Sequence, residues 1–153
     1  MSCRLAPLGE EGPEQGLGFT FGHAAPDFGL VVGLGVDEDP RAVTILDRID
    51  TDAALVTTLF RHEMRHLLLS AERGKRLHSR QVGEAISILG ALDLTEKGVR
   101  DESEVLDLAR KYGLSGYDAV YFALAVAEKL PLATFDKQLR AAGLAAGVEI
   151  LPP

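Results

Sequence analysis

Apolar and polar residues alternate along this chain in blocks that predict short strands separated by helices. Short apolar, β-branched runs are typical of buried strands, and they occupy residues 53–57, 92–95, 130–134 and 148–151. Helical spacing of apolar residues fills much of the remainder, at 40–49, 59–73, 79–92, 101–113, 115–129 and 137–142. Because strands alternate with helices, we expect an α/β fold whose mostly parallel sheet is covered on both faces.

Capping residues support several of these helix boundaries. Ser79 and Ser115 stand where N-caps are expected, since their hydroxyl groups can accept a hydrogen bond from the first helical turn. Gly113 occupies a natural left-handed C-cap position, and Gly143 is expected to close the last helix. The helix at 115–129 is apolar on all sides, which indicates full burial.

The N-terminal part of the chain has a different character. Eight of the 16 glycines lie in the first 35 residues, where helical periodicity is weak. We therefore expect residues 1–18 to form an irregular arm. The 153 residues predict a single domain over 1–153 with a core large enough to fold without disulfides.

The net charge of the chain limits the kinds of partner that it can bind. Against 23 acidic residues stand only 16 basic ones, and the net charge of −7 excludes loose, charge-driven binding to nucleic acids or anionic membranes. Nucleic-acid chemistry would therefore require metal ions or a local basic patch. The single cysteine, Cys3, cannot form an internal disulfide. The absence of a signal peptide and of an apolar run near the roughly 20 residues of a membrane span predicts a cytoplasmic protein without membrane contact.

Three carboxylates fall where ligands bind in α/β folds. Glu63 lies in the helix after strand 53–57, Asp136 directly follows strand 130–134, and Asp118 lies in the first turn of a helix. Taken singly, each has an ordinary explanation as a solvated residue, a turn or cap, or a partner of the helix dipole. Their joint placement at one rim favours a cation site, because clustered carboxylates repel one another unless a cation neutralises them. Oxygen-rich sites of this kind suit Mg²⁺ or Mn²⁺.

At their mutual spacing, two motifs connect the chain to a known family. The segments Tyr117-Asp-Ala-Val-Tyr121 and Thr134-Phe-Asp136 resemble the C-terminal half of PIN-domain ribonucleases, specifically the VapC toxins of bacterial toxin–antitoxin pairs. The resemblance extends back through Asp39-Pro-Arg-Ala and covers residues 27–151. It implies a three-layer α/β/α fold with a central sheet of four to five strands. It also implies an endoribonuclease that hydrolyses RNA phosphodiester bonds with Mg²⁺ or Mn²⁺.

The resemblance implies four acids that act as catalytic residues and metal ligands. Glu63, Asp118 and Asp136 match three of them, and the fourth should end the first strand. Asp27 stands at the right distance from Asp39-Pro40 but follows a poor strand, whereas Asp37 follows the better strand 30–36 but lies too close to Pro40. We favour Asp27. Without a fourth acid, the chain would be a catalytically degenerate PIN fold that acts only as a binding protein.

Supporting residues and partners follow from the same resemblance. Supporting roles fall to Thr134, His66 and Tyr117, and the expected partners are RNA, a VapB-like antitoxin and a second copy of the chain. Arg61 and Arg65 are candidate RNA contacts within a basic cluster that continues through Arg73, Lys75 and Arg76. The plainer interpretation of that cluster is a solvated helix end.

A rival motif overlaps the same helix. His62-Glu-Met-Arg-His66 matches the H-E-x-x-H pattern of zinc metalloproteases, in which two histidines bind zinc and Glu63 is the general base. Arg65 places a charge inside the motif, and no third ligand follows at the usual spacing, with His78 only a distant candidate. Because the alternation of strands and helices also differs from the usual zincin layout, we keep a zinc protease as the alternative.

Overall fold

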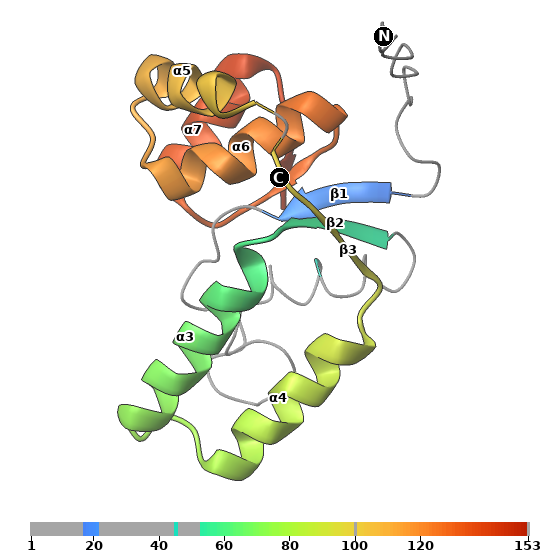
Figure 1. The fold of residues 1–153 in the computed structure, drawn as a ribbon, viewed down its shortest axis with the longest axis vertical. Helices are drawn as coiled ribbons and strands as arrows, with labels where there is room; N and C mark the ends of the chain where they lie inside the picture. The colour runs from blue at the N-terminus through green and yellow to red at the C-terminus, as the bar shows by residue number, and fades with distance from the viewer. Residues whose placement is uncertain (1–16, 22–44, 46–52, 100, 153) are drawn as a thin grey trace, which may run out of the picture.

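The computed structural model describes residues 17–21, 45, 53–99 and 101–152, and these build a five-stranded sheet (Figure 1). All described strand pairs are parallel, and the strand order is β3-β2-β1-β4-β5. The strands are β1 (Leu17–Phe21), β2 (Ala53–Thr57), β3 (Leu94–Lys97), β4 (Leu132–Ala133) and β5 (Ile150–Leu151). This confirms the expected parallel sheet of four to five strands.

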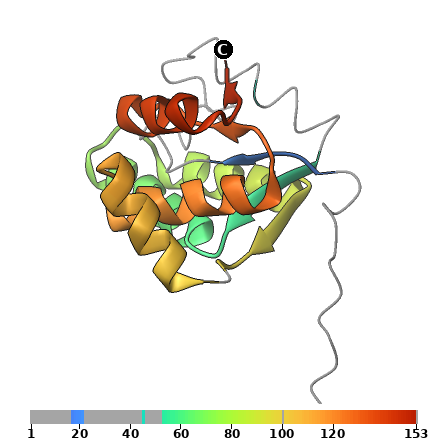
Figure 2. The ribbon, with the colours of Figure 1, turned by 90° about the horizontal axis from the view of Figure 1, so that it is seen from above.

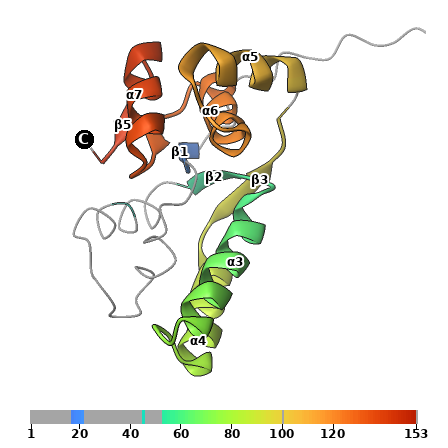
Figure 3. The same ribbon diagram turned by 90° about the vertical axis from the view of Figure 1, so that its left-hand side faces the viewer.

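Helices cover both faces of the sheet, which confirms the three-layer α/β/α arrangement. One side carries α5, α6 and α7, and Figure 2 shows these helices lying over the strands from above. The opposite side carries α3 and α4, as the side view in Figure 3 shows. Their bounds are α3 (Phe60–Arg73), α4 (Ser79–Ala91), α5 (Glu102–Tyr112), α6 (Gly116–Glu128) and α7 (Lys137–Ala146).

The sheet separates two apolar cores because successive strand residues face opposite sides. In β4, Leu132 packs into the core beneath α5, α6 and α7, whereas Ala133 belongs to the core shared with α3 and α4. β5 divides in the same way, with Ile150 in the first core and Leu151 in the second. The two strands therefore tie both helical layers to one sheet.

Several predicted boundaries are confirmed. The strand β2 spans the predicted residues 53–57. α5 ends at Gly113, whose φ of 66° is left-handed, and Ser115 caps α6 by accepting a hydrogen bond from the backbone N–H of Asp118. Residues 119 and 121–125 of α6 are buried, but the predicted full burial of this helix was wrong, because Tyr117 at its start and Ala127 near its end are exposed.

The predicted end of the last helix was wrong. α7 continues past Gly143 to Ala146 and ends at Gly147, whose φ of 75° is left-handed. A Cβ atom at Gly143 would collide with Cδ1 of Ile150 on β5. Glycine at this position allows α7 to approach β5 closely, whereas a larger residue would displace the end of the Ile150 side chain.

The predicted cap of α4 was also wrong by one residue. His78 is the N-cap, and its backbone N–H donates to Oε1 of Gln81 at 2.9 Å in a capping box. The Ser79 hydroxyl donates instead to Oε1 of Glu72, at 2.5 Å, and so ties the start of α4 to the end of α3. The serine stabilises the corner between two helices.

The first strand lies earlier than expected. β1 occupies Leu17–Phe21 and pairs with both β2 and β4, so residues 17 and 18 belong to the sheet, and the expected arm over 1–18 was wrong for them. The strands expected before Asp27 and Asp37 lie outside the described residues, as does the helix 40–49 except for Ile45, which is buried. Phe19, Thr20 and Phe21 give β1 its β-propensity. Its glycine-rich surroundings hid that signal in the sequence.

Helix lengths in the described ranges are modest. None of the described helices combines the length and the apolar character that crossing a bilayer requires.

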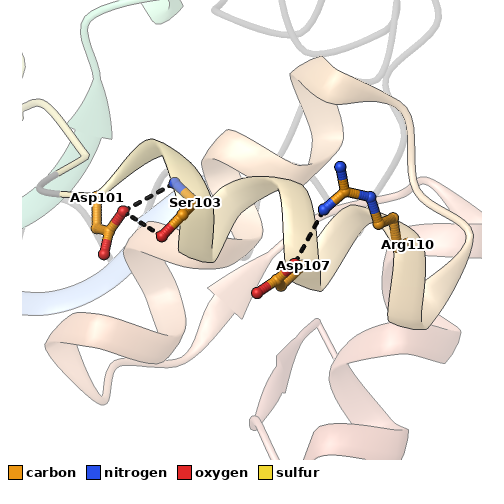
Figure 4. A network of polar contacts seen from close by, with 4 residues as sticks. All are labelled: Asp101, Ser103, Asp107 and Arg110. Carbon is orange, nitrogen blue, oxygen red and sulfur yellow. Dashed lines mark hydrogen bonds and ion pairs between the residues drawn. The ribbon is translucent and has the colours of Figure 1, made fainter.

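The N-cap of α5 provides a prediction on pH dependence (Figure 4). The Asp101 carboxylate accepts hydrogen bonds from the backbone N–H of Ser103 at 2.8 Å and from its hydroxyl at 2.7 Å. Both hydrogen bonds lower the pKa of Asp101 below its usual value, and the bond from the Ser103 hydroxyl has the larger effect. Since the folded pKa lies below the unfolded one, the stabilisation is present above the ordinary aspartate pKa and is lost as the pH falls through the folded value.

We therefore expect Asp101→Ala to lower the urea midpoint at neutral pH, and the difference from the wild type to shrink as the protein is acidified below the ordinary aspartate pKa. Urea titrations at a series of pH values measure this directly. Asp107→Ala is the matched control, because Asp107 lies on the same helix and forms only an exposed ion pair with Arg110 at 3.0 Å (Figure 4). A difference that stayed constant with pH would contradict the prediction.

Candidate functional site

The three acids predicted from the sequence lie at or near the N-terminal ends of helices. Glu63 lies in the first turn of α3, directly after β2, and Asp118 lies in the first turn of α6. Asp136 is the N-cap of α7 and follows β4. Because β2 and β4 flank β1 in the sheet, Glu63 and Asp136 follow the carboxyl ends of two strands on either side of the central strand.

Glu63 and Asp118 are brought together around Tyr121. The hydroxyl group of Tyr121 donates a short hydrogen bond to Oε2 of Glu63, across 58 positions of sequence. Tyr121 is fully buried and lies one helical turn after Asp118 on α6. The charges of both carboxylates act on the phenol. Tyr121 therefore lies within the electrostatic influence of both acids, and their joint role as metal ligands stays a prediction.

The surroundings of Tyr121 keep its hydroxyl protonated. Burial is the largest cause that raises the pKa of Tyr121 above its usual range, followed by the hydrogen bond to Glu63, with the charges of Glu63 and Asp118 adding to it. The Thr57 hydroxyl, at the end of β2, opposes this shift. That hydroxyl is buried and does not meet the geometry of a hydrogen bond with any described group. The phenol therefore remains a hydrogen-bond donor at neutral pH.

Asp118 has one satisfied and one unsatisfied carboxylate oxygen. Its Oδ2 accepts a hydrogen bond from the Ser115 hydroxyl at 2.5 Å, and the backbone N–H of Asp118 donates to the same hydroxyl oxygen at 3.1 Å. Its Oδ1 is buried and has no hydrogen-bond partner among the described residues. An unpaired buried carboxylate oxygen is costly, and a divalent cation is the kind of group that would satisfy it. The donor set at this position fits a hard metal ion.

Asp136 has a clear structural role. Its Oδ1 accepts a hydrogen bond from the backbone N–H of Leu139 at 2.8 Å and so caps α7. Its own backbone N–H donates to Oγ1 of Thr134 at 3.1 Å, and Thr134 is buried. The predicted supporting residue Thr134 thus holds the backbone of Asp136, while a metal-binding role for Asp136 stays a prediction.

The four-acid site itself remains a prediction. Within the described ranges, no three side chains of the His, Cys, Asp or Glu type lie close enough to form a metal site. Asp27 and Asp37, the two candidates for the fourth acid, lie outside the described residues. Of the predicted ligands, Glu63, Asp118 and Asp136 are described, and the charges of Glu63 and Asp118 both act on Tyr121.

The H-E-x-x-H motif receives no support from this geometry. His62 and His66 are both exposed on α3, whereas the Glu63 carboxylate between them accepts a hydrogen bond from Tyr121 of α6. His78, the distant third candidate, caps α4. A supporting role for His66 beside the acids stays a prediction.

The remaining predicted residues lie at the surface. Tyr117, next to Asp118, is 62% exposed. Arg61 forms an ion pair with Glu96 of β3, and Arg65 is exposed. Both arginines border a pocket of about 140 Å³ between α3 and α4, lined further by Phe60, Met64, Leu68, Ile86, Leu89 and Leu94. Arg65 is thus more available to a ligand than Arg61.

Sequence reasoning missed the role of Tyr121. The residue belonged to the motif Tyr117-Asp-Ala-Val-Tyr121 but received no function. The signal was the spacing, because residues three apart on a helix share a face and Tyr121 therefore follows Asp118 toward the same neighbours. The partner across the sheet, Glu63, could not be inferred from that spacing.

Comparisons with known proteins agree with this architecture. The family model described as the PIN domain matches residues 30–144. The chain matches no curated protein. The crystal structure of PAE2754 from Pyrobaculum aerophilum is similar, with a TM-score of 0.61 and 21% identity over 94% of this chain and 92% of that one.

Two further solved structures have a similar fold. A toxin–antitoxin complex from Klebsiella pneumoniae has a TM-score of 0.52 and 15% identity, over 77% of this chain and 86% of that one. FitAcB from Neisseria gonorrhoeae has a TM-score of 0.52 and 17% identity, over 88% of this chain and 97% of that one. At these identities, the likeness shows a shared fold.

Proposed function

Because the chain belongs to the PIN domain family, we propose that it is a metal-dependent endoribonuclease, the toxin component of a type II toxin–antitoxin pair. The observation that carries this proposal is the buried, unpaired Oδ1 of Asp118 in the neighbourhood of Glu63. Glu63 accepts the hydrogen bond of the Tyr121 phenol, and the charge of Asp118 acts on the same phenol, so that both carboxylates could contribute oxygen ligands to one cation. The site is oxygen-rich, which favours Mg²⁺ or Mn²⁺.

The proposed ligands are Glu63, Asp118 and Asp136, with Asp27 or Asp37 as the fourth. When bound, the divalent ion lowers the pKa of a water molecule and offsets the negative charge that develops on the scissile phosphate. The chain's own residues orient the ligands. Ser115 holds Oδ2 of Asp118 and leaves Oδ1 for the ion, and the backbone N–H of Leu139 holds one oxygen of Asp136.

The acidic charge of the chain is compatible with an RNA substrate on this proposal. A net charge of −7 weakens nonspecific binding, so that contact with RNA depends on the bound cation and on nearby basic side chains. The exposed Arg65 is the proposed RNA contact, with Arg61 a weaker candidate because Glu96 already pairs with it. A cytoplasmic location follows for an enzyme that acts on cellular RNA.

The proposed protein partners are a VapB-like antitoxin and a second copy of the chain. The chain shares its fold with a toxin–antitoxin complex from Klebsiella pneumoniae, which supports an antitoxin as the partner. Leu69 of α3 and Ile86 of α4 are 44% and 56% exposed, and both helices border the pocket that contains Arg65. Exposed apolar residues beside a pocket are typical of protein interfaces.

The test is cleavage of a panel of short RNAs by the full-length protein. We expect cleavage in Mn²⁺ or Mg²⁺ and its loss in the presence of a chelator. Absence of cleavage at every metal concentration would contradict the enzyme and favour a PIN fold that only binds a partner. One tightly bound zinc ion per chain in elemental analysis would instead favour the zinc protease alternative.

A further inference from the structure

The hydrogen bond between Tyr121 and Glu63 joins the two helical layers. Tyr121 belongs to α6 on one face of the sheet, and Glu63 belongs to α3 on the other (Figure 3). Thr57, the last residue of β2, acts on the same phenol. The bond therefore passes the carboxyl end of β2, at the rim where the proposed metal ligands lie.

Without the Tyr121 hydroxyl group, the Glu63 side chain would be free to rotate away from this position. Oδ1 of Asp118 has no partner among the described residues, and the charges of Glu63 and Asp118 both act on Tyr121. Glu63 is only partly buried, and its flexible side chain could rotate toward solvent. A donated hydrogen bond to Oε2 of Glu63 opposes that rotation, and bonds to charged acceptors are among the strongest.

We propose that Tyr121 is a positioning residue of the metal site, whose hydroxyl holds the Glu63 carboxylate in place before the ion binds. This inference rests on the proposed function, because it requires Glu63 and Asp118 to be metal ligands. Residues that hydrogen-bond metal ligands orient them for the ion, and their loss weakens metal binding. Tyr121 contacts a ligand and acts through it.

The competing explanation is that the bond only fastens α3 to α6. A fastening role and a positioning role differ in what they change. Loss of a fastening contact lowers the stability of the metal-free protein and leaves the affinity of the folded protein for metal unchanged. Loss of a positioning contact weakens metal binding even under conditions where the variant is fully folded.

The experiment measures Mn²⁺ binding by calorimetry, together with thermal unfolding of the metal-free protein, for the wild type and Tyr121→Phe. The phenylalanine keeps the buried ring and removes only the hydroxyl group. We expect Tyr121→Phe to bind Mn²⁺ about 10-fold to 100-fold more weakly than the wild type. Tyr112→Phe is the matched control, since Tyr112 packs its ring against Phe122 with 5.2 Å between ring centres and is not bonded to the acids. It should keep wild-type affinity.

A second arm tests whether Tyr121 acts through Glu63. In a Glu63→Gln background, which already lacks the ligand charge, adding Tyr121→Phe should change Mn²⁺ affinity by less than about twofold. Equal Mn²⁺ affinity of Tyr121→Phe and the wild type, with or without a lower melting temperature, overturns the inference and leaves the proposed function standing. A wild-type protein that binds no Mn²⁺ overturns the proposed function and this inference with it.

Discussion

Asp118→Asn is expected to reduce metal-dependent RNA cleavage by at least about 100-fold, because loss of a residue that merely supports a ligand already costs up to about that much. The substitution removes the ligand charge and keeps the shape of the side chain. An asparagine side-chain oxygen can still accept the hydrogen bond from Ser115, so the start of α6 should be retained. The rate of cleavage at saturating Mn²⁺ measures the effect.

The same variant should not lose stability. In the metal-free protein, Oδ1 of Asp118 is buried without a described partner, so the substitution breaks no described hydrogen bond of that oxygen. The melting temperature of metal-free Asp118→Asn should therefore stay close to that of the wild type.

Asp107→Asn is the control for charge. Asp107 is an exposed acid on α5, and its replacement changes the net charge by the same amount without touching the acids of the site. It should cleave RNA at the wild-type rate. Wild-type cleavage by Asp118→Asn, in a preparation free of wild-type enzyme, would exclude Asp118 as a metal ligand.

Phe122→Ala is expected to cost about 3–5 kcal/mol of unfolding free energy. Phe122 is fully buried in the core under α5, α6 and α7, where Leu132 and Leu139 also pack. Its ring meets that of Tyr112 edge to face, with centres 5.2 Å apart and planes at 84°. The substitution leaves a cavity and removes this aromatic contact, which itself contributes about 0.5–1.5 kcal/mol.

Urea unfolding measures this loss, and two comparisons interpret it. Phe122→Leu keeps most of the volume and should cost clearly less than Phe122→Ala. Leu144→Ala, at a site that is 68% exposed on α7, should stay within about 0.5 kcal/mol of the wild type. A cost below about 1 kcal/mol for Phe122→Ala would mean that α6 is not packed as described. Since α6 also carries Asp118 and Tyr121, the Phe122→Ala substitution should also lower the affinity of the protein for Mn²⁺.

Much of the fold could be predicted wherever the signal was local. The run Ala53–Thr57 became β2 because a short apolar, β-branched segment has few alternatives to a buried strand. Gly113 and Ser115 were recognised because cap chemistry depends on one residue and its nearest neighbours. The motifs around Asp118 and Asp136 also indicated the family that the PIN domain match established.

Two of the errors share a physical cause, which is contact with another element of the fold. Gly143 resembled a helix end but lies inside α7, where a side chain would meet Ile150 of β5. Residues 17 and 18 resembled the end of an arm but belong to the central strand, because β2 and β4 supply its hydrogen-bonding partners. Neither partner is visible from the local pattern.

The same distinction between local and tertiary features applies to the candidate site. Residue order alone placed Asp118 in the first turn of a helix, Asp136 directly after a strand and Glu63 in the helix after β2, and it predicted a shared rim, since strand ends and caps are local features. It put Glu63 about two turns into that helix, whereas the structure has it in the first turn. Only the tertiary structure decided that Tyr121 bonds to Glu63 across 58 positions, and that one oxygen of Asp118 is satisfied by Ser115 while the other is buried without a described partner. Burial and pairing arise when separate helices pack around one sheet, so they are properties of the folded chain.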